Sequence, residues 1–226
     1  MKSSSISPFQ NRKLNRRVLS GMYRSLFRHY GHRNWWPGET PFEVMIGAIL
    51  TQNTSWRNVE KAIANLKSAK VLSPPALKEI SHSRLARLIR PAGYFNVKSH
   101  RLKNFIEFLW DEFDGEPELM LRVPLQKLRR KLLSVNGIGE ETADSILLYA
   151  AQKRIFVVDA YTRRILSRHG YLKGKETYSE IQKIFTELLP KNVSLYNDYH
   201  AQIVEVGKDF CRGTARCQDC PLRSYL

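Results

Sequence analysis

The amino-acid sequence predicts an all-α protein made of short helices, and three observations lead to this prediction. Apolar residues recur at intervals of three and four along most of the chain, which is the period of a helix with one buried face. No stretch alternates apolar and polar residues cleanly enough to predict a strand. Helix breakers divide the chain at Pro37-Gly38, Pro74-Pro75, Pro91-Ala92-Gly93 and Gly115-Glu116-Pro117. We therefore expect a compact helical bundle.

Taken in order, the periodic segments give the following helices. The first part of the chain is predicted to be helical over Leu14–Tyr30, Phe42–Thr51, Trp56–Ser68, Pro75–Ile80, Ser83–Ile89 and Val97–Phe113. The rest is predicted to be helical over Leu125–Leu133, Glu141–Ala151, Ala160–His169, Tyr178–Leu189 and Tyr196–Phe210. The apolar residues 155–158 are rich in β-branched side chains, and we interpret them as an extended entry to the helix that follows.

The turn between the helices at 125–133 and 141–151 contains two glycines, Gly137 and Gly139, on either side of Ile138. Glycine suits a turn that needs a positive φ or lets another molecule approach the backbone closely. At the start of the second helix the N–H groups of residues 137–140 have no intrahelical partner, so they can bind an anion such as a phosphate. An ordinary helical hairpin is the alternative interpretation.

The charge of the chain favours a polyanionic partner. The 26.3 kDa chain has 37 Lys and Arg against 21 Asp and Glu, a formal charge of +16 and a pI near 9.9. Residues 2–33 contain basic residues and no Asp or Glu. This N-terminal arm could follow phosphates, and we expect residues 1–10 to form a solvated tail. A basic protein without such a partner, or one that binds an acidic membrane surface, is the alternative to a nucleic-acid-binding protein.

The sequence gives no sign of a membrane protein or a secreted one. No segment reaches the roughly 18 apolar residues of a membrane span, and the first ten residues lack the apolar core of a signal peptide. We therefore expect a cytosolic protein. A length of 226 residues allows one large domain or two small ones.

Asp159 follows the apolar residues 155–158 directly and precedes a predicted helix. An Asp in this position is commonly a helix N-cap, whose side chain accepts a hydrogen bond from a free N–H group. The apolar approach also favours a second interpretation, in which the carboxylate lies at the end of a buried wall and takes part in chemistry.

Four segments together carry a family resemblance. The heptapeptide GIGEETA of 137–143, VVDAY of 157–161, LTQNT of 50–54 and the C-terminal cysteines resemble the helix-hairpin-helix DNA glycosylases of the endonuclease III superfamily. NWWP of 34–37 and RPAGYFN of 90–96 are similar to the bacterial 3-methyladenine DNA glycosylases of that superfamily. The resemblance covers nearly the whole chain after about residue 20.

The resemblance implies a two-domain all-α fold with a central cleft that receives the damaged base. One domain, expected at 41–152, has six helices and contains the helix-hairpin-helix at about 125–151. The basic arm and first helix, expected at 1–40, pack with the C-terminal domain expected at 153–226.

The resemblance also implies the chemistry. Asp159 falls at the position of the catalytic aspartate, where a carboxylate stabilises the oxocarbenium-like sugar and orients a water. Members that also cut the strand have a lysine 18 residues before this aspartate, and here that residue is Glu141. A carboxylate cannot form a Schiff base. We therefore expect hydrolysis of the glycosidic bond without efficient strand cleavage, unless Glu141 is only a helix-start acid like Glu140.

Further residues are assigned to base and DNA recognition through the resemblance. The base pocket is expected to contain Trp35, Trp36, Pro37, Trp56, Glu141 and Lys208. A tryptophan face attracts a cation by about 0.5–2 kcal/mol, which would favour a positively charged alkylated purine. Each Trp could equally be a packed core residue, and Lys208 could contact phosphate.

Gln52 is expected to fill the gap left by the flipped base. DNA contacts are also expected from Asn53, Gly137, Ile138, Gly139 and Glu140. The histidines His29, His32, His82, His100, His169 and His200 show no metal-ligand spacing, and we interpret them as surface or core residues.

The cysteines Cys211, Cys217 and Cys220 resemble the loop that holds a [4Fe-4S] cluster in endonuclease III. Such a cluster normally has four thiolate ligands. Here the first interval is one residue shorter than the common pattern and the fourth position falls near Leu226, where the chain stops. A cluster with another fourth ligand, a zinc site and a loop without metal all stay open.

These observations predict a monofunctional base excision repair DNA glycosylase that acts on alkylated purines such as 3-methyladenine. We expect it to need no cofactor for catalysis, to bind double-stranded DNA containing a damaged base, and to work as a monomer at the nucleoid of a bacterial cytoplasm. A related glycosylase specific for oxidised pyrimidines or mismatches, and a non-catalytic lesion-binding protein, are the alternatives.

Overall fold

The computed structural model describes residues 12–226, so the expected N-terminal tail lies outside the described residues. The described chain is helical, and its only β-type pairing is an isolated bridge between Cys211 and Ala215. The all-α prediction is confirmed. In the same residues no helix combines the length and apolarity that a membrane span requires. The chain divides into two compact units, with boundaries after Trp35 and after Ile155, against expected boundaries after residues 40 and 152.

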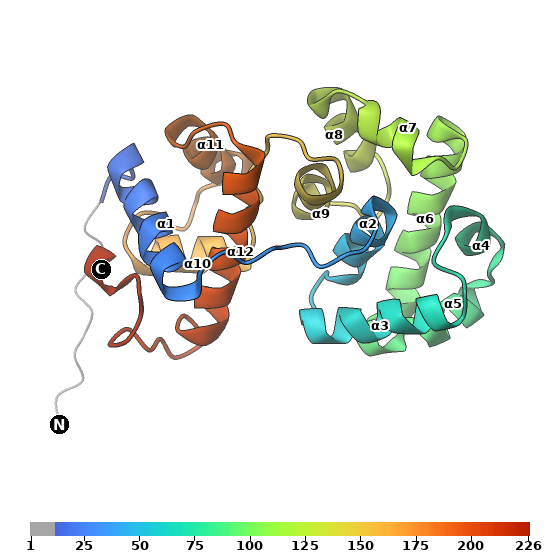
Figure 1. Cartoon of the computed structure of the whole chain (residues 1–226), viewed down its shortest axis with the longest axis horizontal. Coiled ribbons are helices and arrows are strands. Elements are labelled where there is room, and N and C mark those ends of the chain that lie inside the picture. The colour runs from blue at the N-terminus through green and yellow to red at the C-terminus, as the bar shows by residue number, and fades with distance from the viewer. Residues whose placement is uncertain (1–11) are drawn as a thin grey trace. The chain divides into compact units, whose positions relative to one another are not determined.

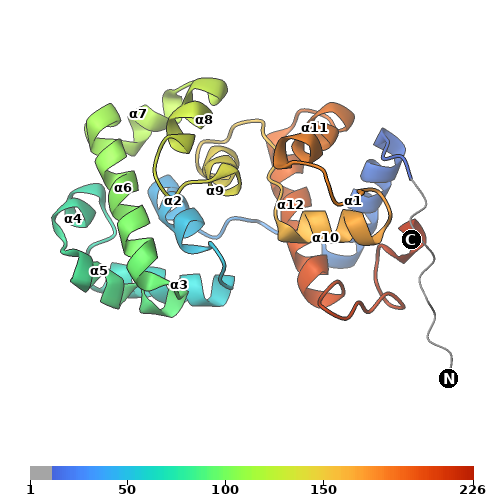
Figure 2. The same cartoon turned by 180° about the vertical axis from the view of Figure 1, so that it is seen from behind.

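The first unit joins the N-terminal helix to the C-terminal third of the chain. It contains α1 (Arg16–Tyr30), α10 (Ala160–Arg168), α11 (Tyr178–Leu188), α12 (Val193–Asp209) and the 3-10 helix η3 (Arg223–Tyr225). Helix α12 packs against both α1 and α10, as Figures 1 and 2 show from opposite sides. The hydroxyl of Tyr199 on α12 donates to the carbonyl of Leu19 on α1 at 3.0 Å. This bond ties the two ends of the chain into one core.

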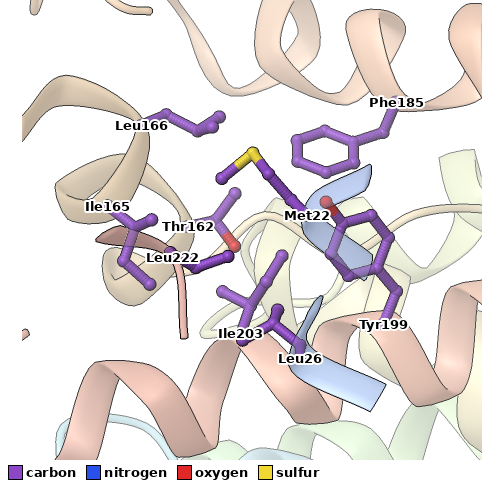
Figure 3. Close-up of a pocket in the computed structure, with 9 residues that line it drawn as sticks. All are labelled: Met22, Leu26, Thr162, Ile165, Leu166, Phe185, Tyr199, Ile203 and Leu222. Carbon is purple, nitrogen blue, oxygen red and sulfur yellow. The ribbon is translucent and has the colours of Figure 1, made fainter. Parts of the chain in front are cut away.

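The centre of the first unit is closely packed. Side chains from α1, α10, α11 and α12 surround a void of about 10 Å³, which Figure 3 shows with Met22, Thr162 and Phe185 among its lining residues. A void of this size is at the lower limit for a single water, so it is core packing rather than a ligand site. Thr162 therefore has one side against the core.

The second unit contains the remaining helices. They are α2 (Pro41–Leu50), α3 (Trp56–Ser68), α4 (Pro74–Glu79), α5 (His82–Leu88), η1 (Arg90–Ala92), α6 (Phe95–Phe113), α7 (Pro117–Arg122), α8 (Leu125–Leu133), α9 (Glu140–Ser145) and η2 (Ile146–Ala150). Helix α6 is the central element, and α2, α4, α5 and α7 pack against it (Figure 1). Its apolar residues Leu102, Phe105 and Leu109 are fully buried, which fits a helix covered on several sides.

Helix starts follow the capping rules. Thr40, Ser73 and Ser81 each accept a backbone N–H at the start of α2, α4 and α5, and Thr177 forms a capping box with Glu180 at α11. Helix α6 ends at Phe113, and Gly115 in the turn that follows has φ +79°; a Cβ there would lie 2.7 Å from the Trp110 ring. Glycine is therefore required at that turn.

The structure corrects two element predictions. Residues 117–122 form the short helix α7, where the sequence predicts a break at Pro117. Proline at the first position of a helix has no N–H to lose and starts helices well. The helix expected at 141–151 is an α-helix only to Ser145 and continues as a π-helix over Ile146–Ala150. Residues 155–158 are buried and belong to no helix or strand.

Candidate functional site

Asp159 is the N-cap of α10. Its Oδ1 accepts the backbone N–H of Thr162 at 2.7 Å and the Thr162 hydroxyl at 2.9 Å. Its Oδ2 lies 3.6 Å from Nε2 of His200 on α12. The residue is only 7% exposed. Asp159 is thus the expected helix cap, and it is also a buried carboxylate with an imidazole beside it.

The environment keeps the Asp159 carboxylate ionised. Burial acts to raise its pKa, but the adjacent His200 imidazole and the two hydrogen bonds from Thr162 outweigh burial and lower the pKa below the ordinary value for Asp. A buried anion of this kind has few competing waters, so its field acts strongly on a positive charge that develops nearby.

The segment before Asp159 is fixed along its length. Phe156, Val157 and Val158 are buried. The carbonyl of Phe156 accepts a hydrogen bond from Nε2 of Gln182 at 2.7 Å, and the N–H of Val158 donates one to the Tyr178 hydroxyl at 3.3 Å. Because α11 satisfies these backbone groups, they need no strand partner.

The hairpin turn in the second unit uses its two glycines differently. Gly137 has φ +94°, and a Cβ there would lie 2.3 Å from the stem of Arg101. Ile138 is 4% exposed and donates its N–H to Val135 at 3.0 Å. Gly139 has φ −90°, and a Cβ there would meet no atom within 4 Å. The fold therefore explains glycine at 137, whereas at 139 the backbone is simply left open on one side.

An ion pair fixes the two helices of the hairpin against each other. Arg129 on α8 donates to both carboxylate oxygens of Asp144, at 2.7 and 3.1 Å, and to Glu140 at 3.3 Å. Asp144 is fully buried. Glu140, expected to contact DNA, is thus engaged within the protein, while Glu141 on the same turn is exposed. A bidentate ion pair of this kind fixes the relative orientation of the two side chains and also contributes interaction energy.

Gln52 is bound to the hairpin. Its Nε2 donates to the carbonyl of Gly137 at 3.0 Å and to the Thr142 hydroxyl at 2.9 Å, and its Oε1 accepts from Arg101. The next residue, Asn53, is exposed with φ +53°, a backbone conformation that Asn tolerates better than most residues. Gln52 therefore connects the loop after α2 to the hairpin turn.

A buried lysine supports the same loop. Lys98 on α6 is fully buried and donates to the carbonyls of Leu50 at 2.8 Å and Ala92 at 2.7 Å. Burial lowers its pKa to about 8, with a smaller contribution from Arg101. Leu50 is the last residue of α2, so Lys98 caps that helix immediately before Gln52.

The expected pocket aromatics form two groups. In the second unit Trp36 lies edge-on to Trp56, with ring centroids 5.1 Å apart, and also contacts Tyr149 at 5.1 Å. In the first unit the Lys208 ammonium lies 5.7 Å from the centroid of the Trp35 ring and pairs with Glu205 at 3.1 Å. All three indoles are partly exposed.

An acidic cavity opens beside Trp56. Pro37 and Trp56 line it together with Glu39, Glu43 and Glu60, and its volume is about 380 Å³. Lys67, which also lines the cavity, pairs with Glu39 at 2.8 Å and with Glu43 at 2.9 Å. With one cation against three carboxylates, the cavity retains negative charge in a strongly basic chain.

The C-terminal cysteines do not form a four-thiolate site. All three line one cavity of about 20 Å³, and burial raises the pKa of Cys220. Arg168 donates to the sulfur of Cys211 at 3.3 Å and to the carbonyls of Arg212 and Gly213. Across the described residues no three His, Cys, Asp or Glu side chains are arranged to hold a metal ion. These residues therefore do not fit a [4Fe-4S] cluster, which is normally held by four thiolates.

Two residues that contact predicted site residues, one in each unit, were not singled out from the sequence. His200 was interpreted only as a surface or core residue, and Arg101 received no role. His200 follows Asp159 by 41 residues and Arg101 follows Gln52 by 49, so no local pattern connects either pair. Only the inward-facing position of each residue on a long helix could have indicated a role.

Residues 46–191 match the model of the HhH-GPD superfamily base excision DNA repair proteins. The chain is 50% identical over 210 residues to a proposed DNA repair glycosylase of Methanocaldococcus jannaschii, which covers 92% of this chain and 95% of that protein. It is 30% identical over 186 residues to endonuclease III of Sulfolobus acidocaldarius, which covers 81% of this chain and 80% of that enzyme.

Solved structures agree with this match. The H. pylori 3-methyladenine DNA glycosylase bound to 1,N6-ethenoadenine superposes with a TM-score of 0.74 at 29% identity, over 86% of this chain and 98% of that one. A non-covalent endonuclease III–DNA complex has a TM-score of 0.80 at 21% identity, over 94% of this chain and 95% of that one, and supports the fold alone.

Proposed function

The chain belongs to the HhH-GPD superfamily of base excision DNA repair proteins, and we propose that it is a monofunctional DNA glycosylase that removes alkylated purines such as 3-methyladenine from double-stranded DNA. In the proposed reaction the bond between C1′ and the base breaks, and the electron pair leaves with the base. A water oxygen adds to C1′ and loses its proton, giving an abasic site and a free base.

The observation that carries this proposal is the ionised, buried carboxylate of Asp159. Positive charge develops on the sugar as the glycosidic bond breaks, and a fixed anion in a low-dielectric site stabilises that charge. The same carboxylate can orient the attacking water and take its proton. An alkylated purine already carries a positive charge and leaves as a neutral base, so it requires neither a strong general acid nor a cofactor.

Water is proposed as the nucleophile because Glu141 occupies the position of the lyase lysine. A lysine would attack C1′ and hold the sugar as a Schiff base, which leads to strand cleavage. Glu141 is exposed and has no nucleophilic amine to offer. The expected product is an intact strand with an abasic site.

Selectivity for a cationic base is supported by the aromatic residues and by the acidic cavity. Trp36 and Trp56 offer ring faces that attract a cation. The carboxylates of Glu39, Glu43 and Glu60 beside Trp56 have the same preference for positive charge. The H. pylori enzyme, 29% identical to this chain, was solved with a modified adenine, which also supports a purine substrate.

DNA binding is proposed to use the hairpin and Gln52. The open backbone face at Gly139 lies at the start of α9, where backbone N–H groups suit a phosphate oxygen. Gln52 is proposed to occupy the gap left by the flipped base. The net charge of +16 supplies general attraction to DNA. We propose that the protein acts as a monomer.

A second candidate is a glycosylase for oxidised pyrimidines or mismatches, because several relatives are named endonuclease III. A panel assay distinguishes the two. Duplexes carrying 3-methyladenine, an oxidised pyrimidine or a mismatch are incubated with the wild type and with Asp159→Asn, and the released free base is measured by mass spectrometry. Release of the alkylated purine by the wild type alone supports the proposal. Preferential release of either other base would favour the second candidate.

A further inference from the structure

The two carboxylate oxygens of Asp159 have separate surroundings. Oδ1 accepts both hydrogen bonds from Thr162, so the cap of α10 occupies this oxygen. Oδ2 faces Nε2 of His200 at 3.6 Å. That distance is longer than a hydrogen bond, so a small movement of either side chain would close it. The side chains of His200 and Asp159 are 7% and 9% exposed.

His200 lies against aromatic residues of the core as well as against Asp159. The ring of Phe156 lies edge-on to the imidazole at 6.4 Å and 89°. Phe156 is itself stacked on Phe185 of α11, with centroids 4.0 Å apart. The residue before His200 is Tyr199, whose hydroxyl is bound to α1. His200 is therefore presented to the carboxylate by a rigid surround.

We propose that His200 is a positioning residue for Asp159, which holds Oδ2 in the orientation in which the carboxylate faces the deoxyribose during base removal. Rotation of the carboxylate is then restricted at both oxygens, by Thr162 at one and by the imidazole at the other. This inference rests on the proposed function. It adds a residue that acts through Asp159 and does not itself touch the DNA.

Two features support this role over simple packing. The imidazole places a polar nitrogen next to Oδ2, the oxygen of the buried carboxylate that Thr162 does not contact. The same imidazole helps to lower the pKa of Asp159 in spite of its burial. If His200 only filled space in the core, its replacement by leucine would leave the rate of base removal unchanged.

The test compares His200→Leu with His200→Gln. Single-turnover excision with excess protein on an alkylated duplex gives the chemical rate, and fluorescence anisotropy with the same duplex gives Kd. His200→Leu is expected to slow excision by about tenfold or more, equivalent to ~1.4 kcal/mol of barrier, with Kd little changed. His200→Gln is expected to recover most of the rate, because its Nε2 can donate to Oδ2.

His169→Leu is the matched control. His169 is also a buried histidine of the first unit, 8% exposed, but it lines the cavity of the C-terminal cysteines. Its replacement is expected to lower Tm and to leave the single-turnover rate unchanged at a temperature where all variants are folded. Circular dichroism melts of the three variants define that temperature.

The outcomes separate this inference from the proposed function. If the wild type excises the base and His200→Leu is equally fast, the proposed role of His200 is overturned, while the proposed function stands. If His200→Gln and His169→Leu excise the base as slowly as His200→Leu does, the effect is structural, and the proposed role of His200 is also overturned. A wild type that releases no alkylated base overturns the proposed function and this role together.

Discussion

Gln52 and Gly137 are joined by a hydrogen bond of 3.0 Å from the side-chain amide to the backbone carbonyl. The second N–H of the same amide donates to Thr142, and the amide oxygen accepts from Arg101. The whole amide is thus used inside the protein. If Gln52 occupies the gap left by a flipped base, as proposed, it must give up these bonds, so this proposed role is coupled to the hairpin turn.

This coupling predicts that Gln52→Ala destabilises the protein as well as weakening DNA binding. Removing the amide leaves the Gly137 carbonyl without this donor, and an unpaired polar group costs about 1–3 kcal/mol. Urea unfolding should show a decrease of that size, and Arg57→Ala at an exposed position of α3 is the control. A Gln52→Ala protein as stable as the wild type would mean that the bond to Gly137 contributes nothing.

The two hairpin glycines should respond differently to alanine. Gly137→Ala is strained by its positive φ and meets the Arg101 stem, so we expect a loss of stability of roughly 1–3 kcal/mol. Gly139→Ala meets open space, and its stability should be unchanged. Its methyl group would instead obstruct a phosphate, and loss of one phosphate contact lowers the salt dependence of binding by about 0.9 in log–log slope. Unchanged affinity and slope for Gly139→Ala would remove the hairpin from DNA contact.

Lys98 predicts a specific dependence of stability on pH. Its folded pKa of about 8 lies below the unfolded value, so between pH 8 and about 10.4 the unfolded chain binds more protons. Wild-type stability should therefore rise through that window relative to Lys98→Met. Urea unfolding at pH 7 and pH 9.5 measures the difference. At pH 7 the variant should still be less stable, because the carbonyls of Leu50 and Ala92 lose their donor.

The lowered pKa of Asp159 predicts how the excision rate depends on pH in the acidic range. Its pKa is lowered in the folded protein, so the carboxylate stays ionised as the pH falls from 8 to about 5, above the ordinary Asp value of about 3.9. Single-turnover excision should therefore be flat over that range. The stability that this anion contributes is present above the unfolded pKa and is lost as the pH falls through the folded one. An Asp159-dependent acid limb near pH 6 would contradict this assignment.

The sequence predicted the elements well where the signal was local. The bounds of α3 and α8 agree at both ends, because a regular apolar period and clear flanking signals define them. Helix α7 was missed because six residues are too few to show a period, and its starting proline was interpreted only as a breaker.

The candidate site was less accessible from the sequence. Asp159 stood out because an apolar run leads into it. The contacts of Gln52 with Gly137 and of Asp159 with His200 join residues far apart in the chain, and their existence depends on how helices pack. Composition and spacing carry no information about such pairs, so the imidazole beside Asp159 became visible only in the structure.

The most direct test of the central claim uses a duplex with a single 3-methyladenine in a labelled strand. The wild type is incubated with it, and half of each sample is treated with hot alkali before a denaturing gel. We expect the strand to stay intact without alkali and to break at the lesion after alkali, since Asp159 is proposed to direct water and Glu141 supplies no amine. Strand cleavage without alkali, with a protein–DNA adduct trapped by borohydride, would contradict it.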